Sequence, residues 1–432
     1  MSELHTHSCP FGPLRRALPG EQLTALSHVS CGPSNDKERT EGMNQFTREV
    51  VDWTLSRLSG KAQTLLTRYS LFALACLGLR RIPVVLLRGP TNLSGQLGTL
   101  LVAGQDPWVS YLPSRFFVGE PQRELVGNVS PWELPALLNR LRTSADLTVA
   151  RVDRLSARTW FGHDYLAVPE WVGTKLSVPD DLDKLMRSGG SLRRDMTLIR
   201  RHKFLPLVTR GNEDFEMFYH SMYLPFTRTR HGELAFMRKP HDLRHRLGRG
   251  GILWMLRDGQ RVAGMQFERT GQTLDLLALG TVNGDLALVR DGAIAALYYH
   301  VIRLARELGC TMVDFRGSRP SLSDGLLRFK RKWGITLYDR SDTYYDLLIY
   351  WNGVHGVVKD FFSHTGLIFR DEGRLSAIHA DESQDCGSLW VGGLHRLYLL
   401  TESGRQPMMD EGASLSIAGA GHDSGQAYQG AR

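Results

Sequence analysis

A carboxylate and a guanidinium flank one aromatic residue in the short β-prone run from 312 to 317. Asp314 and Arg316 are two positions apart, so in a strand they point to one face, opposite to Phe315. A charged face beside a Gly-Ser-Arg loop suits substrate binding better than core packing. Asp314 can accept a proton there, or it can form a salt bridge with Arg316. The sequence leaves both interpretations open.

A second group of charged and aromatic residues follows between 325 and 334. Lys330, Arg331 and Lys332 are consecutive, while Phe329 and Trp333 are four apart and share one face of a helix. We expect Arg331 and Lys332 to face solvent. The aromatic residues are core residues by default, with substrate contact as the alternative for Trp333.

The elements around these residues follow from periodicity and from glycines. Apolar residues recur every three or four positions from 294 to 308, which predicts a helix that Gly309 ends. The strand from 312 follows, and a short helix with Ser323 as its cap comes next. Upstream, three β-prone runs between 252 and 279 are separated by two turns, which predicts an antiparallel meander.

Meander, helix, strand and helix form the core order of the GNAT acyltransferase fold. The residues resemble the FemAB/BioF2-like branch of that superfamily more narrowly. The resemblance is carried by Gly292-Ala293 with Ala296-Leu297-Tyr298, by Val313 to Ser318, and by Asp324 to Leu327 followed by Phe329 to Gly334. It is specific over 250–339, weaker over 188–249 and absent at both ends.

The resemblance implies an α/β (α+β) fold with two tandem GNAT-like lobes, each a mixed sheet flanked by helices. We expect a disordered leader at 1–42, a degenerate first lobe at 43–185 and a basic helical connection at 186–249. The catalytic lobe is expected at 250–350, and a terminal helix with a largely disordered tail at 351–432.

The first half of the chain supports a mixed sheet by its own pattern. The region from 65 to 79 predicts a buried helix, with contact to a membrane surface as the alternative, because its longest charge-free run is too short to span a bilayer. Strands are predicted at 83–87, 97–102, 109–112, 147–152 and 165–168, and a helix at 131–141.

By resemblance, the function is an N-acyltransferase that moves an acyl or aminoacyl group to an amine. Such enzymes hold the reactants with backbone hydrogen bonds along a splayed pair of strands, so no nucleophile is expected. The resemblance implies that Lys330 stabilises the oxyanion or a phosphate. Asp314 would take the amine proton, and Tyr299 is a candidate general acid, although buried tyrosine is the alternative. Arg228, Arg230 and His231 are expected to line the acceptor site, with Trp333.

The donor stays open between acyl-CoA, an acyl carrier protein and aminoacyl-tRNA. The turn Arg290 to Ala295 departs from the coenzyme A pattern, because one residue is missing and Asp291 adds a negative charge where a pyrophosphate would lie. The predicted cofactor-binding residues are Arg290, Gly292, Ala293, Arg316, Ser318 and Arg319. The five cysteines lie far apart without metal-ligand spacing, so no metal is expected.

Positive charge is concentrated in one part of the chain. Residues 184–250 hold 15 Lys or Arg against 6 Asp or Glu, an excess as large as the net charge of +8 of the whole chain. This excess favours an anionic partner such as tRNA, a phosphorylated cofactor or an anionic lipid surface. A lipid-linked or small-molecule amine is the expected acceptor, in the cytoplasm or at the inner face of the membrane. The rival function is a non-catalytic module that binds nucleic acid or anionic lipid.

Overall fold

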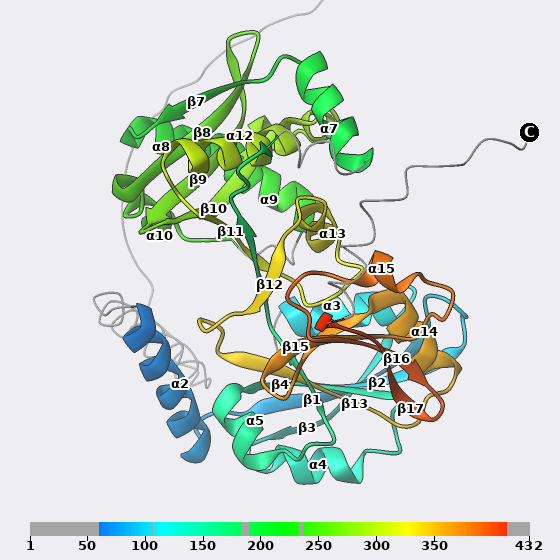
Figure 1. Cartoon of the computed structure of the whole chain (residues 1–432). Coiled ribbons are helices and arrows are strands. Elements are labelled where there is room, and N and C mark those ends of the chain that lie inside the picture. Colours follow the sequence, from blue (N-terminus) through cyan, green and yellow to red (C-terminus); the bar gives the residue numbers. More distant parts are fainter. Residues whose placement is uncertain (1–59, 105–106, 183–189, 233–236, 413–432) are drawn as a thin grey trace, which may run out of the picture. The chain divides into compact units, whose positions relative to one another are not determined.

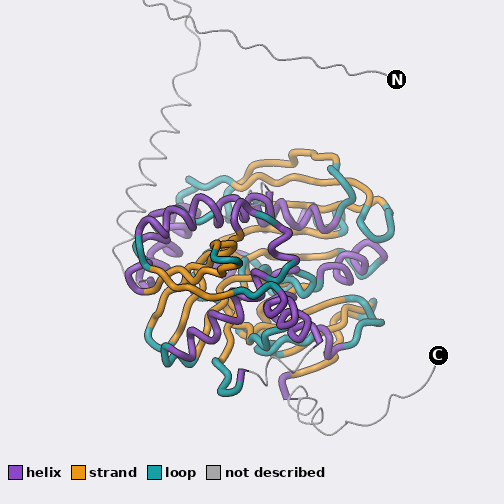
Figure 2. The backbone as a smooth tube through the Cα atoms, turned by 90° about the horizontal axis from the view of Figure 1, so that it is seen from above, coloured by secondary structure: helices purple, strands orange, loops and turns teal. Residues whose placement is uncertain are grey.

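The computed structural model describes residues 60–104, 107–182, 190–232 and 237–412, which belong to one unit that begins at Ser59. The predicted leader and the last twenty residues lie outside this range, as does the side chain of His231. The described chain builds three β-sheets flanked by helices, as Figures 1 and 2 show. The predicted mixed α/β class is therefore confirmed.

The first sheet has the strand order β3-β1-β2-β4-β13-β5. Its strands are β1 (Ile82–Pro90), β2 (Leu97–Ala103), β3 (Gln122–Val129), β4 (Leu147–Asp153), β5 (Leu166–Pro169) and β13 (Tyr345–Trp351). The helices in this part of the chain are α2 (Gly60–Cys76), α3 (Pro107–Phe116), α4 (Leu134–Arg140) and α5 (Arg154–Trp160). The strand predicted at 109–112 is wrong, because α3 occupies these residues and buries Tyr111, Leu112 and Phe116 at helical spacing.

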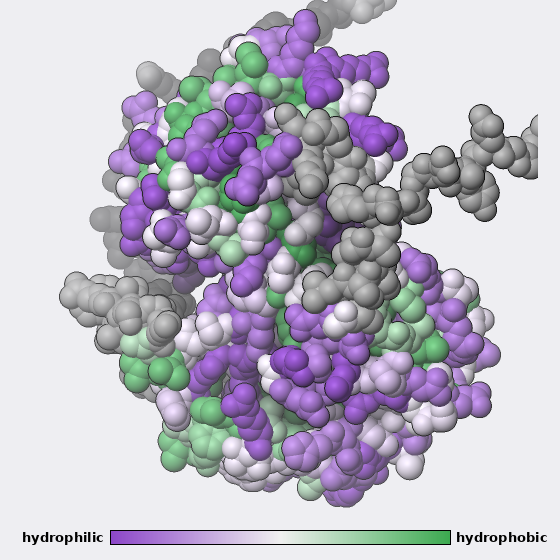
Figure 3. All heavy atoms as spheres, in the orientation of Figure 1, coloured by the Kyte–Doolittle hydropathy of each residue, from purple (hydrophilic) through white to green (hydrophobic). Residues whose placement is uncertain are grey.

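Helix α2 differs from the buried helix predicted there. It buries Thr64 and Ala75, and Arg68 donates to the carbonyl of Ser341, but several apolar side chains on its other faces are exposed. Leu65 is 52 % exposed and Tyr69 is 61 % exposed. Hydrophobic spheres accordingly appear on the surface around α2 in Figure 3. Among the described helices none combines the length and apolarity that a membrane span requires.

The second sheet has the order β12-β6-β11-β10-β9-β8-β7. Its strands are β6 (Val172–Ser177), β7 (Leu205–Thr209), β8 (Gly250–Arg257), β9 (Gln260–Thr270), β10 (Thr273–Thr281), β11 (Met312–Ser318) and β12 (Thr336–Asp339). The predicted meander is β8, β9 and β10. The two sheets exchange strands. β6 precedes the predicted boundary at 185 but belongs to the second sheet, and β13 follows β12 but belongs to the first sheet. The contiguous lobes predicted from sequence therefore do not coincide with the sheets.

Helices on the second sheet include the predicted central helix, α12 (Ala293–Glu307). One face of it, with Leu297, Val301 and Ala305, is fully buried. Gly309 ends the helical segment with φ of +68°, as predicted. The other helices here are α7 (Gly190–Arg201), α8 (Asn212–Phe218), the π-helix η1 (Tyr219–Tyr223), α9 (Leu224–His231), α10 (Pro240–Arg244), the 3₁₀ turns η3 (Leu247–Arg249) and η4 (Val282–Gly284), α11 (Leu286–Arg290) and α13 (Gly325–Arg331).

The third sheet corrects the prediction of a largely disordered tail. Beyond α14 (Gly356–Thr365), residues 367–410 form β14 (Leu367–Asp371), β15 (Arg374–His379), β16 (Arg396–Thr401) and β17 (Gly404–Asp410), with α15 (Cys386–Leu389) between β15 and β16. The order is β14-β15-β16-β17. Residues 381–388 are mostly polar, but Ile368, Ala377 and Leu397 are fully buried and supply the apolar contacts that hold the sheet.

Candidate active site

Strands β10 and β11 are parallel neighbours that stay paired over only three residues. Thr273 pairs with Met312, Leu274 with Val313 and Asp275 with Asp314. Beyond these pairs β10 shifts its register against β9, and β11 has an irregularity between Asp314 and Gly317. Arg316 lies at that irregularity with φ of +60°, an uncommon value for a residue with a side chain. The two strands therefore diverge immediately after the Asp275–Asp314 pair, as the family resemblance implies.

Three carboxylates lie side by side across the sheet at this point. Glu268 of β9 pairs with Asp275 of β10, which pairs with Asp314 of β11. Directly opposite residues in neighbouring strands point to the same face, so the three side chains form a row. Glu268 is 2 % exposed and Asp275 is 7 % exposed. We call these residues the carboxylate row. Its face is opposite to the one on which Leu274 and Leu276 pack with α12.

Each member of the carboxylate row has a different partner. Glu268 receives hydrogen bonds from Arg246 (2.7 Å) and Arg249 (2.6 Å). Burial raises the pKa of Glu268, but these two arginines outweigh it and leave the pKa lowered. Asp275 lies 3.4 Å from Arg316, yet burial and the charge of Asp314 keep its pKa raised. A buried carboxyl with a raised pKa beside a second carboxyl is suited to exchanging a proton.

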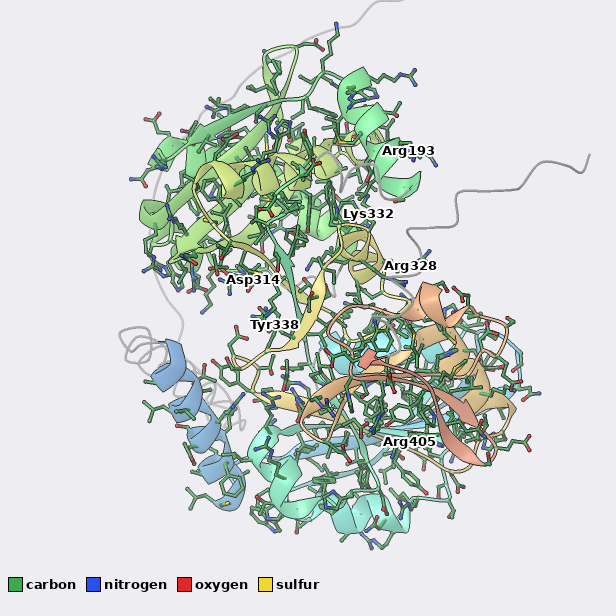
Figure 4. All side chains as sticks on the ribbon, viewed as in Figure 1. Arg193, Asp314, Arg328, Lys332, Tyr338 and Arg405 are labelled. Carbon is green, nitrogen blue, oxygen red and sulfur yellow. The ribbon has the colours of Figure 1, made fainter. Side chains whose placement is uncertain are left out.

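Asp314 accepts hydrogen bonds from two donors. The hydroxyl of Tyr338 donates over 2.7 Å, and the backbone N–H of Arg316 also donates over 2.7 Å. Figure 4 labels Asp314 on β11 and Tyr338 on β12. Burial raises the pKa of Tyr338, and Asp314 raises it further, so the phenol stays a donor. The salt bridge expected between Asp314 and Arg316 is not the one that forms, because the guanidinium turns to Asp275.

Lys330 is buried at the end of β11, with 2 % of its surface exposed. Its ammonium donates to the carbonyl oxygens of Phe315 (2.7 Å) and Gly317 (2.9 Å) and to Oγ of Ser318 (3.1 Å). Burial lowers the pKa of Lys330 to about 7, although Asp314 and Asp324 act to raise it. All three of its hydrogen atoms have acceptors, so Lys330 holds the bent end of β11 in shape. To contact a reacting carbonyl, as predicted, Lys330 must give up its hydrogen bond to one of these three acceptors.

The aromatic residues of α12 and α13 form a packed core beside Lys330. Tyr298 stacks on Trp333 at 6.0 Å between ring centroids and meets Phe315 and Phe329 edge-on at 5.0 Å. Trp333 is 0 % exposed, so the prediction that it contacts substrate is wrong. The predicted cap Ser323 is also replaced, because Asp324 caps α13 by accepting from the N–H of Leu327 over 2.9 Å.

Tyr299 lies on α12 and is half-buried. Its ring meets His300 edge-on at 5.0 Å and lies 6.0 Å from the guanidinium of Arg303. Burial lowers the pKa of His300 to about 4, so this neighbour is neutral near pH 7. Within the described residues no hydrogen bond joins Tyr299 to Asp314 or Lys330. Its role as a general acid stays a prediction.

The start of α12 is covered by α7. Gly292 has φ of +95°, and a Cβ placed on it would lie 3.0 Å from Cβ of Leu198 in α7. Ala293 is 0 % exposed. Asp291 is held by Arg257 at 2.8 Å, whereas Arg290 is exposed. Of the predicted cofactor-binding residues in this turn, only Arg290 presents its side chain to solvent.

The remaining predicted residues fall into two groups. Ser318 is fully buried against Lys330, and the guanidinium of Arg319 lies 3.7 Å from the centroid of the Tyr111 ring of α3. Arg228 and Arg230 are exposed on α9. Asp314, Arg316, Ser318 and Lys330 are thus brought together, while the predicted acceptor and α12 residues lie on other elements.

The sequence analysis missed Glu268, Asp275 and Tyr338. A signal was present for Asp275, because it interrupts the apolar run from 274 to 279, whereas Glu268 stands at the polar end of its predicted strand. No local sequence signal indicated Tyr338, because its hydrogen-bond partner Asp314 lies 24 positions earlier. Within the described ranges no three His, Cys, Asp or Glu side chains are placed to hold a metal ion.

No protein-family model and no curated protein matches the sequence. Solved structures do align with it. L-PGS from Bacillus licheniformis aligns at 13 % identity over 63 % of this chain and 87 % of that one, with a TM-score of 0.31. FemX aligns at 15 % identity over 62 % and 87 %, with a TM-score of 0.32. A GCN5-related N-acetyltransferase from Kribbella flavida aligns at 13 % identity over 66 % and 93 %, with a TM-score of 0.23.

The resemblance to GNAT-type proteins stays a prediction, because alignments with TM-scores below 0.5 carry no argument. Identities and TM-scores in this range carry no conclusion about chemistry. The function proposed below therefore rests on the divergence of β10 and β11 and on the contacts around it.

Proposed function

We propose that the chain is an N-acyltransferase that moves an acyl or aminoacyl group from an activated ester or thioester to an amine. The observation that supports this most is the divergence of β10 and β11 directly after Asp275 and Asp314. Diverging strands leave backbone N–H and C=O groups that an extended substrate can bind, and N–H groups can stabilise the oxygen of a reacting carbonyl.

The carboxylate row supplies the proton acceptor for this reaction. The amine nitrogen attacks the carbonyl carbon, and the proton it loses passes to Asp275 or Asp314. The bond from carbon to the donor's oxygen or sulfur then breaks, and the leaving group takes up a proton. Asp275 is the better base, because its raised pKa makes it the stronger proton acceptor of the buried acids.

Lys330 acts from the end of β11. While it holds the carbonyls of Phe315 and Gly317, it keeps β11 bent away from β10. When a substrate is bound, one of its hydrogen atoms can turn to the developing oxyanion. Lys330 thus has a positioning role in the free protein and a proposed catalytic role in the complex.

The donor that we favour is aminoacyl-tRNA. Leu198 covers Gly292, in the turn that already departs from the coenzyme A pattern because Asp291 lies where a pyrophosphate would bind. On α7, by contrast, Arg194, Arg200 and Arg201 are exposed and have no ion-pair partner in the described chain. Spheres over α7 are correspondingly hydrophilic in Figure 3. Arginines held on a rigid helix suit contact with a phosphate backbone.

Transfer of a labelled group from acetyl-CoA or from a pool of aminoacyl-tRNAs to a panel of amines tests the function. We expect transfer by the wild type, a loss of about 10²-fold or more in Asp275→Asn, and full activity in the exposed control Glu402→Gln. No transfer from any donor by a folded wild type would refute the enzyme. Tight binding of RNA that falls steeply with salt, without transfer, would instead favour the non-catalytic module.

A further inference from the structure

Arg238 is a cation held in place by two tyrosine hydroxyls. Tyr219 donates to the backbone carbonyl of Arg238 over 2.9 Å, and the backbone N–H of Arg238 donates to the hydroxyl of Tyr223 over 2.9 Å. Both tyrosines belong to the π-helix η1, whose side chains pack with Leu277 of β10. The half-buried Arg238 side chain has no carboxylate within 4 Å among the described residues. The fold therefore fixes the backbone of a cation whose guanidinium has no carboxylate partner in the described chain.

Two neighbouring arginines carry unused donors. Nε of Arg316 and Nε of Arg246 are buried, and neither has an acceptor in the described chain. Their other nitrogens contact Asp275 and Glu268 of the carboxylate row. Gln266, two positions before Glu268 in β9, donates to the carbonyl of Leu243 over 2.8 Å, so the segment that carries Arg238 and Arg246 covers the face of the carboxylate row. The pKa of Arg238 is accordingly lowered by burial first and then by the charges of Arg316, Arg246 and Arg340, while Tyr223 acts to raise it. A buried donor without an acceptor destabilises the fold.

An oxyanion would remove both penalties at once. It would accept hydrogen bonds from the unused N–H groups of these arginines and compensate the mutual repulsion of their charges. The same face of the sheet holds the carboxylate row, where the amine of the acceptor is to lose its proton. Positive and negative groups of the protein thus lie next to each other at the point where β10 and β11 diverge.

We propose that Arg238, Arg246 and Arg316 bind an oxyanion of the acceptor, so that the acceptor is an amine that carries its own carboxylate or phosphate. The inference rests on the proposed function, because only a transferase has an acceptor. The binding of the oxyanion itself does not require any transfer. Arg238 is the specificity-determining residue, because Arg246 and Arg316 already have carboxylate partners.

Calorimetric titration with matched pairs of amines tests the proposal. Lysine is compared with cadaverine, which lacks the carboxylate, and phosphoethanolamine with ethanolamine, which lacks the phosphate. We expect the wild type to bind at least one acidic member about tenfold or more tightly than its partner. This preference should disappear in Arg238→Gln, and the arm that shows it identifies carboxylate or phosphate.

The control is Arg269→Gln. Arg269 follows Glu268 in β9 and points to the opposite face, so its loss should leave the preference unchanged. Arg238→Lys keeps the charge but lacks the planar fork, and we expect it to retain only part of the preference. This variant also keeps the test decisive if Arg238→Gln fails to fold.

The proposal is overturned if the folded wild type binds both members of each pair equally. It is also overturned if Arg238→Gln and Arg269→Gln behave alike. A preference that depends on Arg238 in a protein without transferase activity would leave the site standing and remove the proposed function. Equal transfer to amines with and without an acid group would support the proposed function and remove the oxyanion site.

Discussion

Gly173 of β6 and the ring of Tyr338 in β12 are packed so closely that a Cβ on Gly173 would overlap the ring. The two residues are cross-strand partners. Because the Tyr338 hydroxyl is bonded to Asp314, the missing side chain at Gly173 determines where a donor of the active site lies. A strand from the first half of the chain thus positions a residue in the second.

Gly173→Ala should therefore displace Tyr338 and lower the free energy of unfolding by about 1–3 kcal/mol, the usual cost of overpacking. Urea unfolding measures this change. Gly162→Ala is the control, since a Cβ there meets no atom within 4 Å. Tyr338→Phe, which removes only the hydroxyl, should cost about 1 kcal/mol. Equal stability of the Gly173→Ala and Gly162→Ala variants would contradict the packing described.

Lys330 should make stability depend on pH above neutrality. Its pKa is lowered in the folded protein to about 7, so between pH 7 and the ordinary value near 10.5 the unfolded chain binds more protons than the folded one. The free energy of unfolding should then rise with pH by about 1.4 kcal/mol per pH unit in this window, relative to Lys330→Met. Chemical unfolding at pH 7, 8 and 9 compares the two proteins. If the free energies of unfolding of the two proteins change with pH in parallel, burial does not lower the pKa of Lys330.

Asp275 should control the pH dependence of transfer. As a base it works only when ionised, and its pKa is raised by burial, so the rate should increase as pH rises through that raised pKa. The same shift makes the folded protein bind the extra proton, so Asp275 lowers stability as pH rises through this range.

In Asp275→Asn the rising limb should disappear along with the bulk of the rate. Initial rates from pH 5 to pH 9 provide the measurement. A variant that keeps the wild-type profile at reduced rate would assign the proton transfer to another group.

An ion-pair network holds the third sheet to the other two. Arg370 of β14 donates to Asp339 at the end of β12 (2.7 and 2.8 Å) and to Asp346 of β13 (2.5 Å). Asp346 is 7 % exposed. Arg370→Met should cost about 3–5 kcal/mol, because it leaves a buried carboxylate with less compensation. The exposed pair of Arg88 and Glu124 gives the comparison, since Arg88→Met should cost at most about 1 kcal/mol.

Thermal and urea unfolding of both variants measure the difference. If Arg370→Met is no more costly than Arg88→Met, the network does not hold the sheets together.

The sequence by itself determined the local elements of the second sheet. The β-prone runs of the meander and of β11 and the apolar period of three to four residues in α12 are local patterns. Gly309 ends the helix because glycine adopts a positive φ without steric cost. It also placed Asp314 on β11 and Lys330 on the short helix that follows this strand. These features depend on neighbours within a few residues, which a pattern records.

Only the tertiary structure decided which charges meet. Asp275 pairs with Asp314 across 39 positions, and β6 and β13 join sheets built largely from the other half of the chain. The third sheet also forms from strands that flank a mostly polar stretch, residues 381–388. Register between distant strands is set by the burial of whole faces and not by local propensity, so the carboxylate row and the partners of Lys330 appear only once the chain is folded.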